Sequence, residues 1–172
     1  MFHVGDLIIY SSHGICHIDE ICEKTLFGVT RTYYIIHPLE NQDLTISAPV
    51  DQETIFGIVG RLEAAEILQS FQSPGIPWIE KINERTRMYS DIIKTGDRKK
   101  ISSIVNTLMR KKMEIEHEGK KFAEADRKLL QAVQRTLFCE LAISLNKSFD
   151  TIHEEATQLI KLNDLSTDVV SQ

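Results

Sequence analysis

The chain has 172 residues and a net charge of −5, with 42% hydrophobic and 26% charged residues. This length fits one domain or two small ones, and the composition excludes a disordered, collagen-like or disulfide-stapled chain. No apolar run approaches the roughly 20 residues of a membrane span, and the start MFHVGDLIIY lacks the basic stretch of a secretion signal. We therefore expect a cytoplasmic protein with no membrane partner.

The charge is divided unevenly along the chain. Residues 1–73 carry −7, residues 74–130 carry +5 and residues 131–172 carry −3. The sign changes at the segment SPGIP, residues 73–77, which holds two of the four prolines. Because proline disfavours helix in the residue before it, this segment predicts a linker or sharp turn. We place the domain boundary there, between residues 73 and 74.

Before this segment the pattern is mostly that of β-strands. Short runs rich in Ile, Tyr and Thr lie at residues 6–10, 15–21, 32–37 and 44–48, and turn-forming stretches such as 11–14 separate them. Evenly spaced short strands predict a small antiparallel β-barrel. From about residue 62, the spacing of the apolar residues is closer to that of a helix than to that of a strand. A helix is therefore expected to follow the barrel there.

After this segment the pattern is helical. Ile101, Ile104, Val105, Leu108 and Met109 have the spacing of one buried helix face. A broader apolar stripe from residue 129 to 145 predicts a central helix. The fold class is therefore α+β: a small N-terminal antiparallel barrel, residues 1–73, followed by a bundle of four or five helices with a C-terminal tail, residues 74–172.

Two details of the bundle are also expected. Thr151 and Glu154 have the spacing of a capping box, so the last helix is expected to start at about Ser148. Three glutamates surround His117, and this run is expected to form a solvated loop between helices rather than a metal cluster; they are Glu114, Glu116 and Glu118.

Signatures of catalysis are absent from the sequence. We find no Walker lysine motif, no G-x-G-x-x-G, no G-x-S-x-G, no H-E-x-x-H and no C-x-x-C. We therefore expect no catalytic residue, no cofactor and no enzymatic activity.

The best metal candidate is the set His13, Cys16, His17 and Cys22. Adjacent residues of a strand point to opposite faces, so Cys16 and His17 cannot readily meet at one ion. We expect no metal site there and interpret Cys16 and Cys22 as small apolar residues.

The basic segment is the feature that suggests a function. Clustered cations can bind phosphates in a salt-dependent, sequence-independent way. The alternative is that they only cover helix surfaces, because acidic residues lie between them. The cations concerned are Lys81, Arg85, Arg87, Lys94, Arg98, Lys99, Lys100, Arg127 and Lys128.

Trp78 is the only tryptophan and follows Pro77, at the expected start of a helix. A lone tryptophan is most often a core anchor. In basic surroundings, it can instead wedge between bases from the minor groove, as architectural proteins do when they open DNA.

Several segments together resemble the CarD/CdnL family of bacterial transcription regulators. In the second half they are Lys94 to Asp97, the helix through Arg110, and the run from Arg127 to Ala142. In the first half they are Phe2, Val4, Gly5, Asp6, Ile8, Ile9, Tyr10, His13, Gly14, Gly28, Tyr33, Tyr34, Asp43 to Ile46 and Pro49. The similarity covers about residues 1–146.

The resemblance implies a Tudor-like barrel that binds the β-subunit lobe of RNA polymerase. It also implies a helical domain that contacts promoter DNA at the upstream edge of the bubble, where a tryptophan wedge and basic residues stabilise the open complex. Binding of free DNA is expected to be weak, no cofactor is implied, and we expect a monomer.

The family's functional positions map onto this sequence in part. Its two polymerase-binding arginines fall near Lys24 and Ser47. Its wedge position falls on Ile82, while Trp78 lies four residues earlier, where it would share a helix face with Ile82. The DNA-binding residues are thus Trp78 or Ile82 as the wedge, with Arg85, Arg87 and Arg127 on the DNA backbone.

The alternative function is an adaptor that binds the polymerase without significant DNA binding. The displaced Trp78 and the interleaved acidic residues favour it. Salt dependence of DNA binding would separate the two functions.

Overall fold

The computed structural model describes residues 1–10 and 13–169, with side chains to residue 165. Ser11 and Ser12 of the expected first turn lie outside the described residues. Contacts divide the chain into two compact units, Met1–Ile58 and Val59–Gln172, so each is described by itself. No helix in the described part of the chain is long and apolar enough to cross a membrane.

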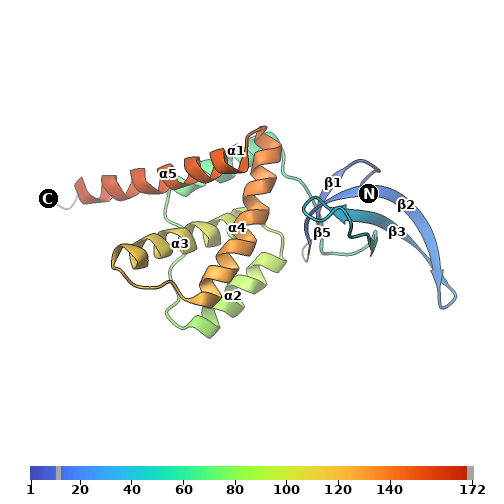
Figure 1. The fold of residues 1–172 in the computed structure, drawn as a ribbon, viewed down its shortest axis with the longest axis horizontal. Coiled ribbons are helices and arrows are strands. Elements are labelled where there is room, and N and C mark those ends of the chain that lie inside the picture. Colours follow the sequence, from blue (N-terminus) through green and yellow to red (C-terminus); the bar gives the residue numbers. More distant parts are fainter. Residues whose placement is uncertain (11–12, 170–172) are drawn as a thin grey trace. The chain divides into compact units, whose positions relative to one another are not determined.

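The first unit is a five-stranded antiparallel sheet, consistent with the Tudor-like domain expected. The strand order is β4-β3-β2-β1-β5, and β2 and β3 form one long curved hairpin (Figure 1). One strand, β5, was not expected from the sequence. The strands are β1 (Leu7–Tyr10), β2 (Gly14–Leu26), β3 (Val29–Pro38), β4 (Ile46–Pro49) and β5 (Ile55–Gly57).

The hairpin is longer than the apolar runs indicated. Strand β2 continues to Leu26 and β3 begins at Val29, joined by Phe27 and Gly28, whose φ angles are 51° and 75°. Two consecutive positive φ angles are those of a type I′ turn, which matches the twist of the paired strands. The core lies on one face of the sheet and consists of Ile8, Cys16, Ile18, Tyr34, Ile36 and Ala48.

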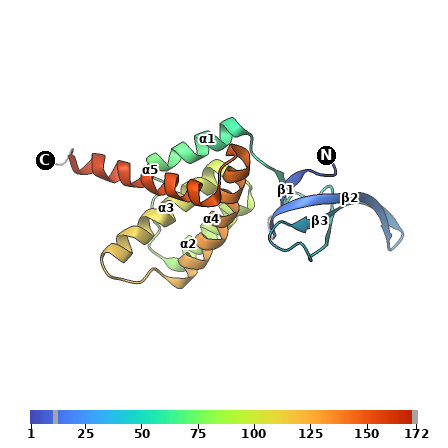
Figure 2. The ribbon, with the colours of Figure 1, turned by 45° about the horizontal axis from the view of Figure 1, so that its top comes forward.

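The second unit is a bundle of five α-helices with one short 3₁₀ turn, Ser70–Gln72. In Figures 1 and 2, α5 runs beside α1. The helices are α1 (Arg61–Gln69), α2 (Ile82–Lys94), α3 (Arg98–His117), α4 (Glu124–Leu145) and α5 (Phe149–Val169). Its core includes Phe71, Tyr89, Ile104, Leu108, Phe138, Leu141, Ile152, Ala156 and Ile160.

Helix α1, expected to trail the β domain, belongs to this second unit. Its buried face of Ala64, Ile67 and Leu68 packs into the core of the bundle. The two compact units therefore divide ahead of α1, and the SPGIP segment lies within the second unit.

The SPGIP segment is held against α3. The Asn106 side-chain amide donates to the Ser73 carbonyl at 2.7 Å, and the Thr107 hydroxyl donates to the Ile76 carbonyl at 2.8 Å. A Cβ atom on Gly75 would collide with Thr107 Oγ1 and the Ser103 carbonyl, so only glycine fits. The segment is a fixed turn rather than a linker.

Helix ends differ from the expectations in two places. Helix α3 extends to His117, so Glu114 and Glu116 are helical and pair with Lys111 and Lys112. Ser148, not Thr151, caps α5, because Ser148 Oγ accepts the Thr151 backbone N–H at 3.1 Å.

Candidate functional site

Lys24 and Ser47, far apart in sequence, lie together on the sheet of the first unit. Lys24 Nζ donates to Ser47 Oγ at 2.7 Å, across the strand that lies between β2 and β4. The ammonium group also lies 5.9 Å from the centroid of the Tyr33 ring. The two positions therefore form one small polar surface, and exposed Arg31 lies directly opposite Lys24 in the strand register.

Beside Lys24, the end of the β2–β3 hairpin exposes apolar side chains. Phe27 is fully exposed at 105%, and Leu26 and Val29 are exposed at 54% and 55%. A bulky residue at positive φ is unusual, since glycine and asparagine dominate such turns. This apolar tip was not expected from the sequence, although a phenylalanine where the turn favours asparagine is a signal that indicates it.

Trp78 lies in the segment without regular secondary structure that precedes α2, and not on the helix. Helix α2 begins at Ile82, so the expectation that Trp78 and Ile82 share a helix face is wrong. Trp78 is partly buried against the core of the bundle, while Ile82 is 44% exposed. The two candidate wedges therefore differ in backbone setting and in burial.

Arg85 lies under the Trp78 ring. Its guanidinium carbon is 3.9 Å from the ring centroid, and Lys111 Nζ is 5.5 Å from the same centroid. The arginine is only 2% exposed, so it cannot contact a DNA phosphate in this arrangement. Its role is to support Trp78 through a cation–π contact.

A buried ion pair holds Arg85 in place. Its Nε and Nη2 donate to the two carboxylate oxygens of Asp126 at 2.9 and 2.5 Å, which joins α2 to α4. Its Nη1 donates to the carbonyl oxygens of Ile79 and Glu80. The backbone that follows Trp78 is therefore tied to the same guanidinium that supports its ring.

The other two expected DNA contacts differ from each other. Arg127 is exposed but donates two hydrogen bonds to Glu124, at 2.8 and 2.6 Å, which raise the pKa of Arg127 and lower that of Glu124. Arg87 is exposed and makes no ion pair within the described residues. It lines a shallow surface depression with Ile82, Lys81, Asn83 and Glu84.

Most of the basic segment is neutralised by nearby acids. Of the 14 cations at residues 74–130, all described by the structure, only Lys81, Arg87 and Lys121 form no ion pair. Arg98, for example, pairs with the buried Glu140, which also accepts the Val59 backbone N–H at 2.9 Å. Burial raises the pKa of Glu140, against the opposing effect of Arg98.

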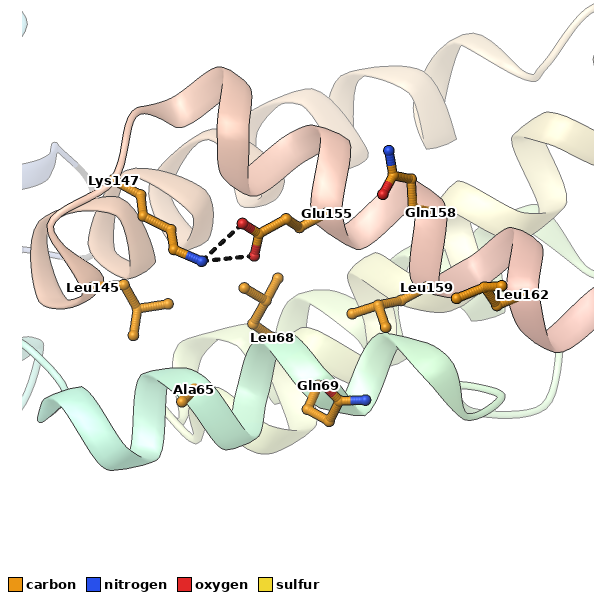
Figure 3. A pocket seen from close by; sticks show the side chains of 9 residues that line it. All are labelled: Ala65, Leu68, Gln69, Leu145, Lys147, Glu155, Gln158, Leu159 and Leu162. Carbon is orange, nitrogen blue, oxygen red and sulfur yellow. Dashed lines mark hydrogen bonds and ion pairs between the residues drawn. The ribbon is translucent and has the colours of Figure 1, made fainter.

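A further hollow lies between α1 and α5 of the bundle (Figure 3). Its lining is mostly apolar, with Leu68, Leu145 and Leu159, and the Lys147–Glu155 ion pair closes one side at 2.8 Å. None of the expected site residues lines it.

Comparisons with known proteins agree with the two-part organisation. The family model described as the CarD-like/TRCF RID domain matches residues 2–55, and the model described as the CarD C-terminal domain matches residues 66–161. A curated relative from Bacillus subtilis (strain 168), named "Putative transcription factor YdeB", is 28% identical over 150 residues. The match covers 83% of this chain and 92% of the relative.

Proposed function

The chain belongs to the CarD family of transcription factors, and from this premise we propose that it binds RNA polymerase and promoter DNA together. It is a regulator of transcription and not an enzyme. In this proposal the first unit binds the β-subunit lobe of the polymerase, and the helical unit holds the upstream edge of the transcription bubble. The proposal needs no cofactor, membrane or second copy of the chain.

The proposed polymerase contact is the surface formed by Lys24, Ser47 and the hairpin tip. Lys24 supplies one positive charge, and the neighbouring Phe27 offers a large apolar side chain. Aromatic side chains buried at the centre of an interface often carry most of the binding energy. Lysine cannot replace the bidentate hydrogen bonding of arginine. In this proposal, Phe27 therefore supplies part of the binding energy that the family's two polymerase-binding arginines would supply.

The observation that carries the DNA proposal is the support of Trp78 by Arg85. An indole ring that wedges between base pairs must be held rigidly, because unstacking bases costs a few kcal/mol per step. The Arg85–Asp126 pair supplies a fixed platform under one face of the ring. Lys81 and Arg87 line a depression with Ile82, Asn83 and the acidic Glu84, and these two unpaired cations would contact the DNA backbone.

The mechanism is differential binding. A factor that contacts opened DNA but not closed DNA shifts the population toward the open complex, whereas equal contacts would shift nothing. Trp78 provides such a contact, because a base step becomes accessible to a wedge only when it unstacks. The few unpaired cations of the basic segment cannot bind DNA tightly by themselves. The polymerase contact therefore provides the affinity of the protein for the polymerase–promoter complex.

A specific observation also favours the second candidate function, a polymerase-binding adaptor without significant DNA binding. The buried Arg85 and the Glu124-paired Arg127 leave only three cations unpaired in the basic segment. Such a surface would release few counterions on binding DNA.

Salt dependence separates the two candidates. The affinity of the polymerase-bound protein for a forked promoter fragment should exceed its affinity for the matched duplex, and the fork affinity should fall as salt rises. A flat salt profile, or equal affinity for fork and duplex, would contradict the proposal and favour the adaptor.

A further inference from the structure

The outer face of the sheet in the first unit carries a cluster of three potential metal ligands. His17 of β2 and His37 of β3 are directly opposite each other in the strand register, and their ring centroids are 5.3 Å apart. Asp19 lies between them: its Oδ1 is 2.9 Å from His17 Nδ1, and its Oδ2 is 2.7 Å from His37 Nδ1. The three ligand atoms lie within 4.8 Å of one another.

A β-bulge brings Asp19 into this position. Ile18 pairs with Ile36 and Glu20 pairs with Ile35, so Asp19 is the extra residue without a partner on β3. Bulges reorient a side chain relative to the regular ladder and are frequent beside functional sites. Here the bulge places one carboxylate between two imidazole rings that come from neighbouring strands.

The same register separates this cluster from the core. Cys16, Ile18 and Ile36 are fully buried on the opposite face, and burial raises the pKa of the Cys16 thiol to about 11. Cys16 is therefore not a ligand, as the alternation of a strand predicts. The sequence pointed to His13, Cys16, His17 and Cys22, whereas the structure groups His17 with two other residues.

Two imidazole nitrogens and one carboxylate are a donor set that suits zinc. Zinc binds histidine nitrogen and carboxylate oxygen at about 2.0–2.2 Å, and sites with three protein ligands keep a fourth position for water. Tetrahedral bonds of that length put neighbouring ligand atoms about 3.4 Å apart. The nitrogen-to-oxygen distances of 2.9 and 2.7 Å, one to each carboxylate oxygen of Asp19, need to open by roughly half an ångström, and the other ligand-atom separations, all within 4.8 Å, need to approach about 3.4 Å.

The cluster is also accessible to an ion from solvent. The side chains of His17, Asp19 and His37 are 36%, 39% and 22% exposed. Partial exposure leaves an entry path and room for the water ligand, which a plausible metal site requires.

We propose that His17, Asp19 and His37 bind one divalent zinc-type ion that joins β2 to β3 at the bulge. The ion takes the place of the hydrogen bonds between the imidazoles and the carboxylate, and a proton on a coordinating Nδ1 moves to Nε2 in a neutral imidazole or to solvent from an imidazolium. Its structural effect is to stabilise the pairing of β2 with β3, and Lys24 and Phe27 lie at the other end of this hairpin. The proposal does not depend on DNA binding or polymerase binding.

The test is a calorimetric titration of the chelator-treated full chain with Zn²⁺ at neutral pH. We expect saturable binding of one ion at this cluster and a rise in the thermal unfolding midpoint. Loss of an outer partner of a metal ligand already weakens binding by about 10–100-fold. His37→Ala and Asp19→Asn, which each remove a ligand, should weaken it at least as much, and Asp19→Asn does so without changing side-chain size.

A matched control is His3→Ala. His3 Nδ1 lies 3.6 Å from Asp6 in the same unit, and the part of the chain that the structure describes offers this histidine–aspartate pair no third ligand. His3→Ala should leave the high-affinity Zn²⁺ site intact. The proposal is overturned if the unmodified chain shows no saturable binding, or if His37→Ala and Asp19→Asn both retain its full affinity. Co²⁺ offers a second probe, because a tetrahedral site would give visible absorption bands that Asp19→Asn abolishes.

Discussion

Arg85 places its guanidinium carbon 3.9 Å from the centroid of the Trp78 ring while it forms a buried ion pair with Asp126. One side chain thus connects the only tryptophan of the chain, the backbone before α2 and the helix α4. The stability of the bundle and the position of Trp78 are coupled through this residue.

Asp126→Ala should destabilise the helical unit strongly. The variant leaves Arg85 buried without its carboxylate partner, and such changes lower the free energy of unfolding by about 3–5 kcal/mol. Urea unfolding of the full chain measures it. Glu124→Ala removes an exposed partner of Arg127 and Lys128 in the first turn of α4 and should shift the unfolding midpoint far less. Equal midpoints for Asp126→Ala and the unmodified chain would show that the buried pair does not hold the bundle.

Gly75→Ala should also destabilise the bundle, because its methyl group would collide with α3 at Thr107 and Ser103. Overpacking of this kind costs about 1–3 kcal/mol. Gly60→Ala is the control, since its φ is −68° and, among the described residues, no atom beyond its chain neighbours lies within 4 Å of the Cβ position; because Gly60 is the N-cap of α1, only a small loss of stability is expected. Thermal unfolding of the two variants side by side distinguishes a fixed turn from a linker; a linker would tolerate both changes equally.

Cys16 should resist thiol reagents across the ordinary pH range. Its pKa of about 11 keeps it neutral where an ordinary thiol, near 9, is already ionised. Since the folded-state pKa is the higher one, this group stabilises the fold below pH 9, and that contribution is lost as pH rises toward 11. Mass spectrometry after iodoacetamide treatment at pH 8 should find native Cys22 modified before Cys16, and unfolding in urea should expose both. Rapid native labelling of Cys16 would contradict the burial of this thiol.

Phe27→Asn tests the proposed polymerase contact without harming the fold. Asparagine followed by Gly28 is the favoured pair for a type I′ turn, so the variant should be at least as stable as the unmodified chain. Loss of a buried aromatic at an interface should weaken polymerase binding about tenfold or more in Kd. Leu62→Gln, at a position 77% exposed on α1, serves as the control for a general loss of apolar surface. Undiminished polymerase affinity of Phe27→Asn, measured by surface-immobilised binding, would exclude the hairpin tip.

The sequence predicted the class of each element better than the contacts of its side chains. Alternating Ile and Tyr residues in β3 and the apolar stripe of α4 identified a strand and a helix, because local periodicity reflects which face is buried. The α+β class and the family were accordingly confirmed.

Long-range pairing was beyond the reach of these patterns. From the sequence, Arg85 looks like a surface cation of an amphipathic helix. The fold brings Asp126, which lies 41 residues later in the chain, into contact with it. The cluster of His17, Asp19 and His37 likewise depends on the register of β2 against β3 and on one bulge, neither of which leaves a signal in local composition.

In the proposed function, Trp78, supported by Arg85, holds the upstream edge of the bubble open. The most direct measurement is the lifetime of polymerase–promoter open complexes after a competitor is added, with the unmodified protein, Trp78→Ala and Ile82→Ala. The account predicts that the unmodified protein extends this lifetime, that Trp78→Ala abolishes the extension while retaining polymerase binding, and that Ile82→Ala retains most of it. An extension by Trp78→Ala equal to that of the unmodified protein would contradict the account.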